Sequence, residues 1–193
     1  MAAGLFLAVM PSYAGELVLH TSNLALLALM AALVLVASCA AQLVTRRAAP
    51  PAQAQAAGLV LLAAGLLALV LAAPEQSAAL LVIGAILAGC GHGVAVLAAQ
   101  DDLTRIAPGG QRAEVSAAFY VCVYLGVAIP VIGIGVLAVV TTLFIAVATF
   151  AAVTGSCALA VAAWHWRNRP GPPREPTVTP GRPGAASYRA AAR

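Results

Sequence analysis

Lysine is missing from this chain of 193 residues, and charge of either sign is scarce. Charged residues make up 8% of the sequence, while hydrophobic residues make up 63%. Soluble globular domains hold about 25% charged and roughly 45–50% apolar residues. These proportions exclude an ordinary soluble domain. The net charge of +4 would favour a nucleic-acid partner in a soluble chain, but beside a bilayer it favours lipid headgroups, and no nucleic acid is expected.

Motifs for catalysis and for cofactors are also missing. The sequence holds no HExxH, Walker or GxGxxG pattern, and no carboxylate pair lies within an apolar run. TGSC at Thr154–Cys157 lacks the trailing glycine of a serine nucleophile elbow. The four cysteines have no metal or redox spacing and are interpreted as small apolar packing residues. We therefore expect no enzyme activity, no cofactor and no metal site.

Long runs without charge are the main feature present. A helix that crosses about 30 Å of hydrocarbon needs about 20 mostly apolar residues. The runs predict an all-α, polytopic membrane domain over residues 1–166. Its six helical segments are expected near residues 2–19, 23–44, 56–73, 77–99, 114–138 and 142–166.

The basic residues sort to alternate connections. All ten are arginines, and they follow the second segment, lie between the fourth and fifth, or follow the sixth. The other connections, near residues 16–23, 73–77 and 139–142, carry no arginine. Arginine-rich connections stay in the cytoplasm during insertion. The pattern predicts a multi-pass protein of the plasma membrane with a cytoplasmic carboxyl terminus.

The two ends of the chain differ from the middle. Segment 2–19 is apolar but short, has no basic start and contains Pro11 and Glu16, so it resembles a spanning helix that has lost its beginning rather than a signal peptide. Residues 167–193 hold six prolines and six arginines. Such a segment buries too little apolar surface to offset its ordering entropy, and it is predicted to be a disordered cytoplasmic tail.

Small residues and a proline mark two of the helices. Gly89 and Gly93 form a small-xxx-small pair, which allows close helix packing in lipid. Gly126, Pro130 and Gly133 line the fifth segment. Proline removes a backbone hydrogen bond and kinks a helix. The kink could be a passive feature of packing or a hinge between two states.

A few polar residues are candidates for a substrate or proton pathway. His92 is an ionisable residue well inside a predicted span. It could carry protons, or it could form a hydrogen bond to a neighbouring helix that its small neighbours allow to come close. Glu16, near Asn23 at the outer end, could bind a proton or be a solvated helix terminus. Tyr124 could line a cavity, whereas Tyr120 is better explained as an interfacial anchor or a packing residue.

Charges of both signs gather in the connection between the fourth and fifth segments. Asp101 and Asp102 stand at helical pair spacing from Arg105, and Arg112 follows. The cluster is either an ion-pair network at a cytoplasmic gate or a solvated loop.

Two stretches carry a resemblance to a known family. The run FLAVMPSYAGELVLHTSNLALLALMAALVLVASCAAQL resembles the seventh and eighth helices of major facilitator superfamily transporters, of the drug-efflux-like bacterial type. LAGCGHGVAVLAAQDDLTRIAPGGQRAEVSAAFYVCVYLGVAIPVIGIGVL resembles their tenth and eleventh helices. The resemblance covers Leu5 to about Trp166 and implies a six-helix half-bundle, the carboxy-terminal half of a 12-helix transporter, with its first helix truncated.

The resemblance also implies a function. Such transporters move small molecules by alternating access, through a cavity between their two halves. We therefore expect secondary active, proton-coupled export, with the bilayer, a small-molecule substrate and either a missing amino-terminal half or a second copy as partners. The alternative is a non-transporting membrane protein, which would be an assembly partner or a degenerate remnant of a transporter.

Overall fold

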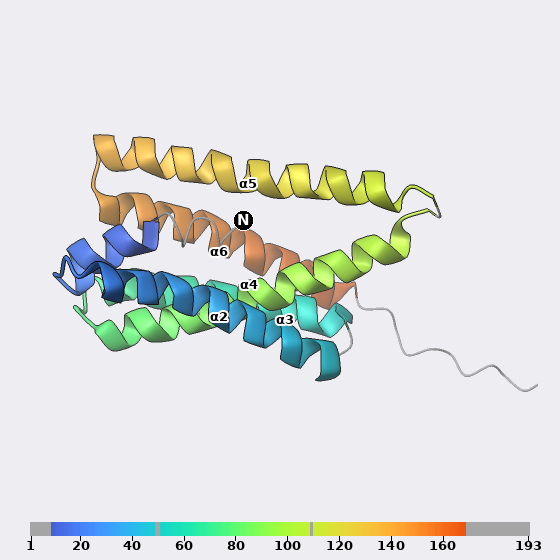
Figure 1. Cartoon of the computed structure of the whole chain (residues 1–193), viewed down its shortest axis with the longest axis horizontal. Coiled ribbons are helices and arrows are strands. Elements are labelled where there is room, and N and C mark those ends of the chain that lie inside the picture. The colour runs from blue at the N-terminus through green and yellow to red at the C-terminus, as the bar shows by residue number, and fades with distance from the viewer. Residues whose placement is uncertain (1–8, 49–50, 109, 169–193) are drawn as a thin grey trace, which may run out of the picture.

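The structure, a computed structural model, describes residues 9–48, 51–108 and 110–168, and within these ranges it contains helices and no strand (Figure 1). Residues 9–18 are helical and end in the π-helix η1 (Ala14–Val18). The helices that follow are α2 (Leu24–Ala48), α3 (Pro51–Ala72), α4 (Ala78–Ile106), α5 (Arg112–Val140) and α6 (Leu143–Arg167).

Helices α2 to α6 are each long and apolar enough to cross a membrane. The prediction of an all-helical, multi-pass membrane protein is confirmed at this level. The described part of the first predicted segment, from Val9 onward, is not among these five candidate spans. The predicted tail lies outside the described residues beyond Asn168.

Polar side chains begin three of the helices. The Asn23 amide oxygen accepts the backbone N–H groups of Ala25 and Leu26, at 3.1 and 3.3 Å, in the first turn of α2. Ser77 and Thr142 cap α4 and α6 in the same way. These N–H groups have no partner within the helix itself, so a side-chain oxygen at the cap stabilises the helix by about 1 kcal/mol.

Several helices are longer than predicted at the arginine-bearing end. Helix α2 continues to Ala48 rather than ending near residue 44. Helix α3 begins at Pro51 rather than near residue 56, because proline is well suited to the first helical position. Helix α4 continues to Ile106 rather than ending near residue 99. It stops where Pro108 follows, since the residue before a proline disfavours helical geometry, and Ala107 is extended with ψ 125°. The predicted loop 100–113 is therefore largely helical at its start.

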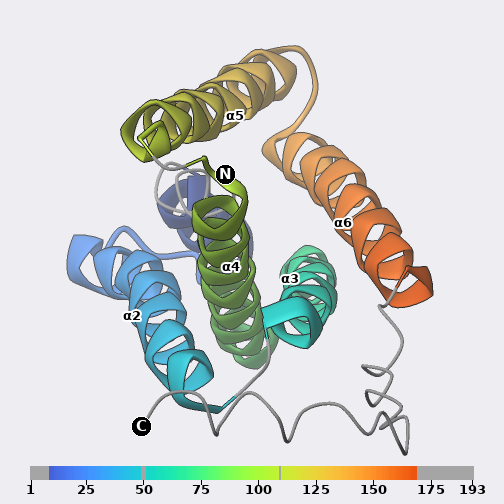
Figure 2. The ribbon, with the colours of Figure 1, turned by 90° about the vertical axis from the view of Figure 1, so that its right-hand side faces the viewer.

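Helix α4 lies at the centre of the arrangement (Figure 2). It packs against α2 on one side and α3 on the other, and α3 packs in turn against α6. Helix α5 lies beyond α6 and touches α4 only slightly. The described arginines, at the ends of α2, α4 and α6 and the start of α5, all lie at one end of the bundle (Figure 1). We call this the inner end and the opposite one the outer end.

Glycines set the close contacts of α4. A Cβ atom on Gly91 would lie 2.3 Å from the Leu62 backbone nitrogen of α3. A Cβ atom on Gly93 would lie 2.3 Å from the Ser38 carbonyl oxygen of α2, and one on Gly89 would lie 2.5 Å from the Val34 carbonyl oxygen. The backbones therefore approach as closely as small residues allow. Gly133 of α5 differs, because nothing lies within 4 Å of its Cβ position.

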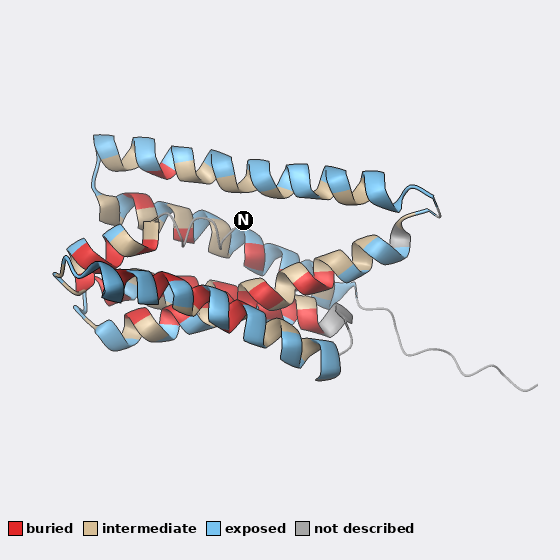
Figure 3. Ribbon diagram, viewed as in Figure 1, coloured by how far each residue is buried: buried red, intermediate tan, exposed pale blue. Residues whose placement is uncertain are grey.

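Burial is concentrated toward the outer end and around α4 (Figure 3). The main core joins residues 10–18 with apolar side chains of α2, α3 and α4, and it includes Tyr13, Val34, Leu69 and Leu81. Helix α5 contributes one buried residue, Ile134, which packs near Ala146 of α6. The outer half is thus closely packed, while the inner half of α5 has no buried residue.

This contrast between glycines predicts different effects for the same substitution. Gly91→Ala forces the α3 and α4 backbones apart, and we expect it to lower the free energy of unfolding by about 1–3 kcal/mol. Gly133→Ala meets no atom and should raise helix propensity, so it should be neutral or stabilising by up to about 1 kcal/mol. Unfolding in detergent micelles measures both. Equal destabilisation by the two variants would contradict the packing described here.

Candidate functional site

His92 is the middle residue of α4 and lies on the face of that helix that points into the bundle. Leu81, Ala85, Ala88 and His92 follow at helical spacing and share one face. The first three are fully buried, with no exposed surface, whereas His92 is half-buried. On either side of it, Gly91 contacts α3 and Gly93 contacts α2. The imidazole therefore lies on the side of α4 between its contacts with these two helices. The described part of the bundle gives it no hydrogen-bond partner.

Tyr124 lies near the middle of α5, as His92 does in α4. It lies two turns before Val131, on the face through which α5 packs against α6 near Ile134. The Tyr124 side chain is 72% exposed, whereas Phe119, Val123 and Val127 of the same helix are half-buried. The residue lies near the middle of the helix, and no hydrogen bond satisfies its hydroxyl group among the described residues. An unsatisfied hydroxyl in hydrocarbon is costly, so this face of α5 is poorly suited to lipid.

A polar cleft of about 260 Å³ opens at the inner end between α2, α4 and α5. Its walls carry Arg46, Gln100, Asp101, Thr104, Ser116 and Tyr120, with Phe119 beside Tyr120. The Gln100 amide donates a long hydrogen bond of 3.5 Å to the Tyr120 hydroxyl, which links α4 to α5. Tyr120, which the sequence suggested to be an interfacial anchor or a packing residue, lies in the wall of this cleft.

The predicted cytoplasmic gate residues lie next to this cleft, on the last turns of α4 and the first turn of α5. Asp101, Arg105 and Arg112 are exposed, and Asp102 is half-buried. No salt bridge joins any of them within the described part of the chain. In this conformation the cluster is solvated, and Asp101 alone of the four lines the cleft.

The two pathway candidates at the outer end lie apart from His92. Glu16 is exposed on η1, and Asn23 is exposed with its amide oxygen committed to the cap of α2. Between them, His20 Nε2 and Gln76 Oε1 form a hydrogen bond of 2.6 Å. Gln76 also donates to the carbonyl oxygens of Leu17 and Ala73. These bonds tie the first helical segment to the α3–α4 turn.

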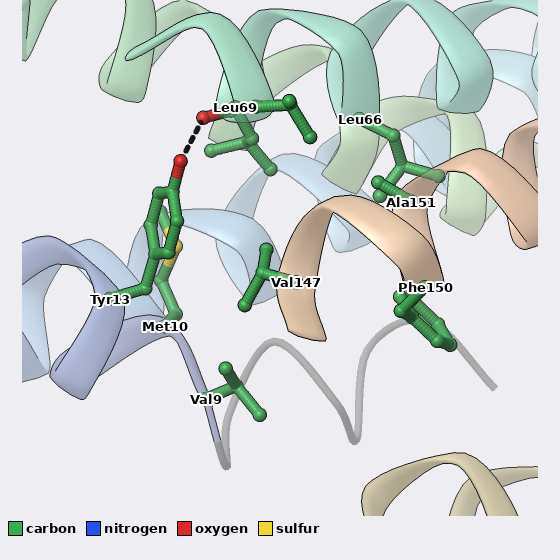
Figure 4. Close-up of a pocket in the computed structure, with 9 residues that line it drawn as sticks. Val9, Met10, Tyr13, Leu66, Leu69, Val147, Phe150 and Ala151 are labelled. Carbon is green, nitrogen blue, oxygen red and sulfur yellow. Dashed lines mark hydrogen bonds between the residues drawn. The ribbon is translucent and has the colours of Figure 1, made fainter. Parts of the chain in front are cut away.

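Tyr13 closes the outer half, a role that the sequence did not indicate. Its side chain is 2% exposed, and its hydroxyl donates a 2.7 Å hydrogen bond to the Leu69 carbonyl oxygen (Figure 4). An apolar cavity of about 30 Å³ lies beside it, between residues 9–13, α3 and α6. The cavity is about large enough for one water molecule, but its apolar lining offers few hydrogen bonds.

The residues predicted to act in packing or hinge motion divide into two groups. Gly89 and Gly93 contact α2 directly. Gly126 and Pro130 are half-buried in α5, which continues as a helix through the proline. Gly133 lies in open space and is not needed for close packing. The hinge interpretation stays a prediction for all three α5 residues.

Neither a metal site nor a known relative indicates the function of the candidate site. The described residues hold no group of three or more His, Cys, Asp and Glu side chains that could bind a metal ion. Comparison of the chain with models of protein families, with curated proteins and with solved structures found no match in any of the three. The candidate site therefore rests on geometry alone: His92 and Tyr124 at mid-depth, above the cleft at the inner end.

Thiol labelling tests whether Tyr124 faces water. In a variant whose four native cysteines are replaced, Tyr124→Cys should react with an impermeant methanethiosulfonate reagent. Thiols react as thiolates, which form in water and not in hydrocarbon. A matched control keeps Cys122 alone, which is exposed at the same depth but turned away by about 200° around the helix. We expect at least about tenfold faster labelling of position 124; equal rates would place both in lipid.

Substitution of Tyr13 tests how much its hydrogen bond and its buried ring stabilise the outer half of the bundle. Tyr13→Phe removes the hydroxyl but keeps the ring, and we expect it to lower the free energy of unfolding by about 1 kcal/mol. Tyr13→Ala also empties a buried site, and it should cost about 3–5 kcal/mol. Tyr124→Phe, at an exposed position, is the control and should change little. Unfolding in detergent micelles gives all three values, and a Tyr13→Phe effect no larger than the control would argue against the hydrogen bond.

Proposed function

We propose that this chain is a membrane domain of a secondary active transporter of the major facilitator type. It exports small molecules by alternating access, coupled to protons, and works together with a second six-helix unit. That unit is either an amino-terminal half or a second copy of the chain. The domain lies in the plasma membrane with its inner end and carboxyl terminus in the cytoplasm. No cofactor, metal or nucleic acid takes part.

The observation that carries this proposal is a pair of polar groups at mid-depth, His92 and Tyr124, for which the described residues offer no hydrogen-bond partner. Polar and ionisable groups inside a membrane are costly, and they mark pathways for substrates and protons. His92 is half-buried on a face that points into the bundle, and Tyr124 is exposed beside the face of α5 that packs against α6. In the proposal, His92 accepts and releases the coupled proton, and Tyr124 contacts the substrate through its ring and hydroxyl.

The unequal packing of the two ends supports alternating access. The outer half is closed by Tyr13 and by the bonds of Gln76, whereas the inner half holds a polar cleft. This is the arrangement expected of a state open toward the cytoplasm. Closure would bring α5 toward α4, with bending near Gly126, Pro130 and Gly133. The charges at positions 101, 102, 105 and 112 would then pair across the inner end, and Glu16 and Asn23 would face the opened outer side.

One observation favours the second candidate, a non-transporting assembly partner. Helix α5 has a single buried residue, so most of its surface is available to another protein. In that case Tyr124 would donate its hydroxyl hydrogen bond to a partner helix instead of to water or substrate. Reconstitution of the chain alone, and with any partner that co-purifies, separates the two candidates.

Efflux of a fluorescent dye from vesicles under an imposed pH gradient tests the proposal. We expect His92→Ala to abolish the dependence of efflux on the gradient, because the proton-carrying group is lost, while passive binding of the dye remains. His165→Ala is the matched control, since His165 lies at the inner end of α6 and outside the pathway. Unchanged pH-dependent efflux by His92→Ala would remove the assigned role of His92. If the unsubstituted chain shows no efflux, either alone or with any partner that co-purifies, the second candidate function, a non-transporting assembly partner, is favoured.

A further inference from the structure

An apolar groove runs between α3 and α6, on the side of α6 away from α5. Val60, Ala64 and Leu67 of α3 form one wall, and Ala148, Ala152 and Ser156 of α6 form the other. The volume of the groove is about 460 Å³. Ala146 and Phe150, which pack toward α5, lie on the opposite face of α6. This groove is thus separate from the His92 and Tyr124 faces.

A cation lies at the inner end of the same helix surface. Ser156, Ala160, Ala163 and Arg167 follow at helical spacing and form one stripe. The stripe begins in the groove and ends at the exposed guanidinium of Arg167. Trp164 and Asn168 flank Arg167 around a second, half-polar hollow. Trp164 is 61% exposed, at the depth where aromatic side chains meet lipid headgroups.

The dimensions fit a lipid of one leaflet. From Gly155 in the groove to Arg167 the helix rises about 18 Å. Half of a bilayer's hydrocarbon core is about 15 Å thick. A phosphate held at Arg167 would therefore place an acyl chain along Ala163 and Ala160 and its end in the groove. Arginine matches phosphate oxygens through two parallel N–H donors, which suits a phosphodiester headgroup.

We propose that this surface binds one anionic phospholipid of the inner leaflet. The phosphate pairs with Arg167, Trp164 packs at the glycerol level, and one acyl chain fills the α3–α6 groove. Both parts are needed. Free phosphate makes no use of the groove, and the phosphate of a zwitterionic lipid carries its own cation, whereas Arg167 has no acidic partner among the described residues. The inference requires insertion of the chain in a bilayer but does not require transport, so the two proposals can fail separately.

The chain carries its own reporter of this site, because its two tryptophans are Trp164 and Trp166. Trp166→Phe leaves Trp164 as the single fluorophore. The full chain with this substitution is reconstituted in phosphatidylcholine vesicles. A small, equal fraction of lipid with acyl chains brominated near the glycerol, at the depth of Trp164, is then added, as phosphatidylglycerol or as phosphatidylcholine. Bromine quenches tryptophan on contact, and one arginine near the membrane surface should favour the anionic lipid by about fivefold.

Two pairs of variants separate headgroup from groove. Arg167→Gln should remove the preference for the anionic lipid, whereas Arg47→Gln, at the exposed inner end of α2, should keep it. Ala152→Leu fills the groove and should weaken quenching by chain-brominated lipid, whereas Val153→Leu, exposed on another face of α6, should not. Equal quenching by both lipids in the parent chain would overturn the proposal. So would a preference that survives Arg167→Gln, or Ala152→Leu and Val153→Leu variants that behave alike.

Discussion

The close approach of α4 to α2 and α3 determines most of the structure. In lipid no hydrophobic force drives helices together, so contact depends on how near their backbones can come. Gly91 allows the close approach of α3, and Gly93 allows that of α2. A Cβ atom at either position would lie only 2.3 Å from the opposing backbone. The two glycines that flank His92 thus face two different helices. His92, between them, is thereby held on the inward face, in line with Leu81, Ala85 and Ala88. The position of the candidate proton carrier follows from packing.

The same constraint explains why the two halves of the bundle differ. Helices held at a close central crossing must diverge at their ends, and something must fill the space between them. At the outer end Tyr13 and the residues around it do so, and a hydrogen bond to Leu69 fixes the ring there. At the inner end Phe119 and Tyr120 leave a polar cleft between α4 and α5. Among the described residues, the Gln100–Tyr120 contact, at 3.5 Å, is the side-chain hydrogen bond between these two helices. A change of conformation would therefore cost least at the inner end.

Much of this organisation can be predicted from the sequence because charge and hydropathy act locally. The sorted arginines and charge-free runs predicted six helical segments, and five of these are candidate membrane spans in the structure. The same patterns predicted that Arg46, Arg105 and Arg112 lie at one end, as found. Contacts between distant residues could not be predicted. Gly93 and Gly133 occupy similar apolar sequences, yet one touches a neighbouring backbone and the other touches nothing. Tyr13 and Leu69 are 56 residues apart, and no local pattern links them. Whether residues 2–19 span and which family the chain belongs to stay predictions.

The proposed lipid site and the proposed pathway use opposite faces of α6, and this separation has a mechanical consequence. Ala146 and Phe150 contact the side that carries α5, while Ala152 and Ser156 face the groove against α3. A lipid that fills the groove holds α6 against α3 without touching α5. Because α3 is fixed to α4 through Gly91 and Gly65, such a lipid would join α3, α4 and α6 into one unit. Helix α5, which has one buried residue, would then be the element left to move against that unit.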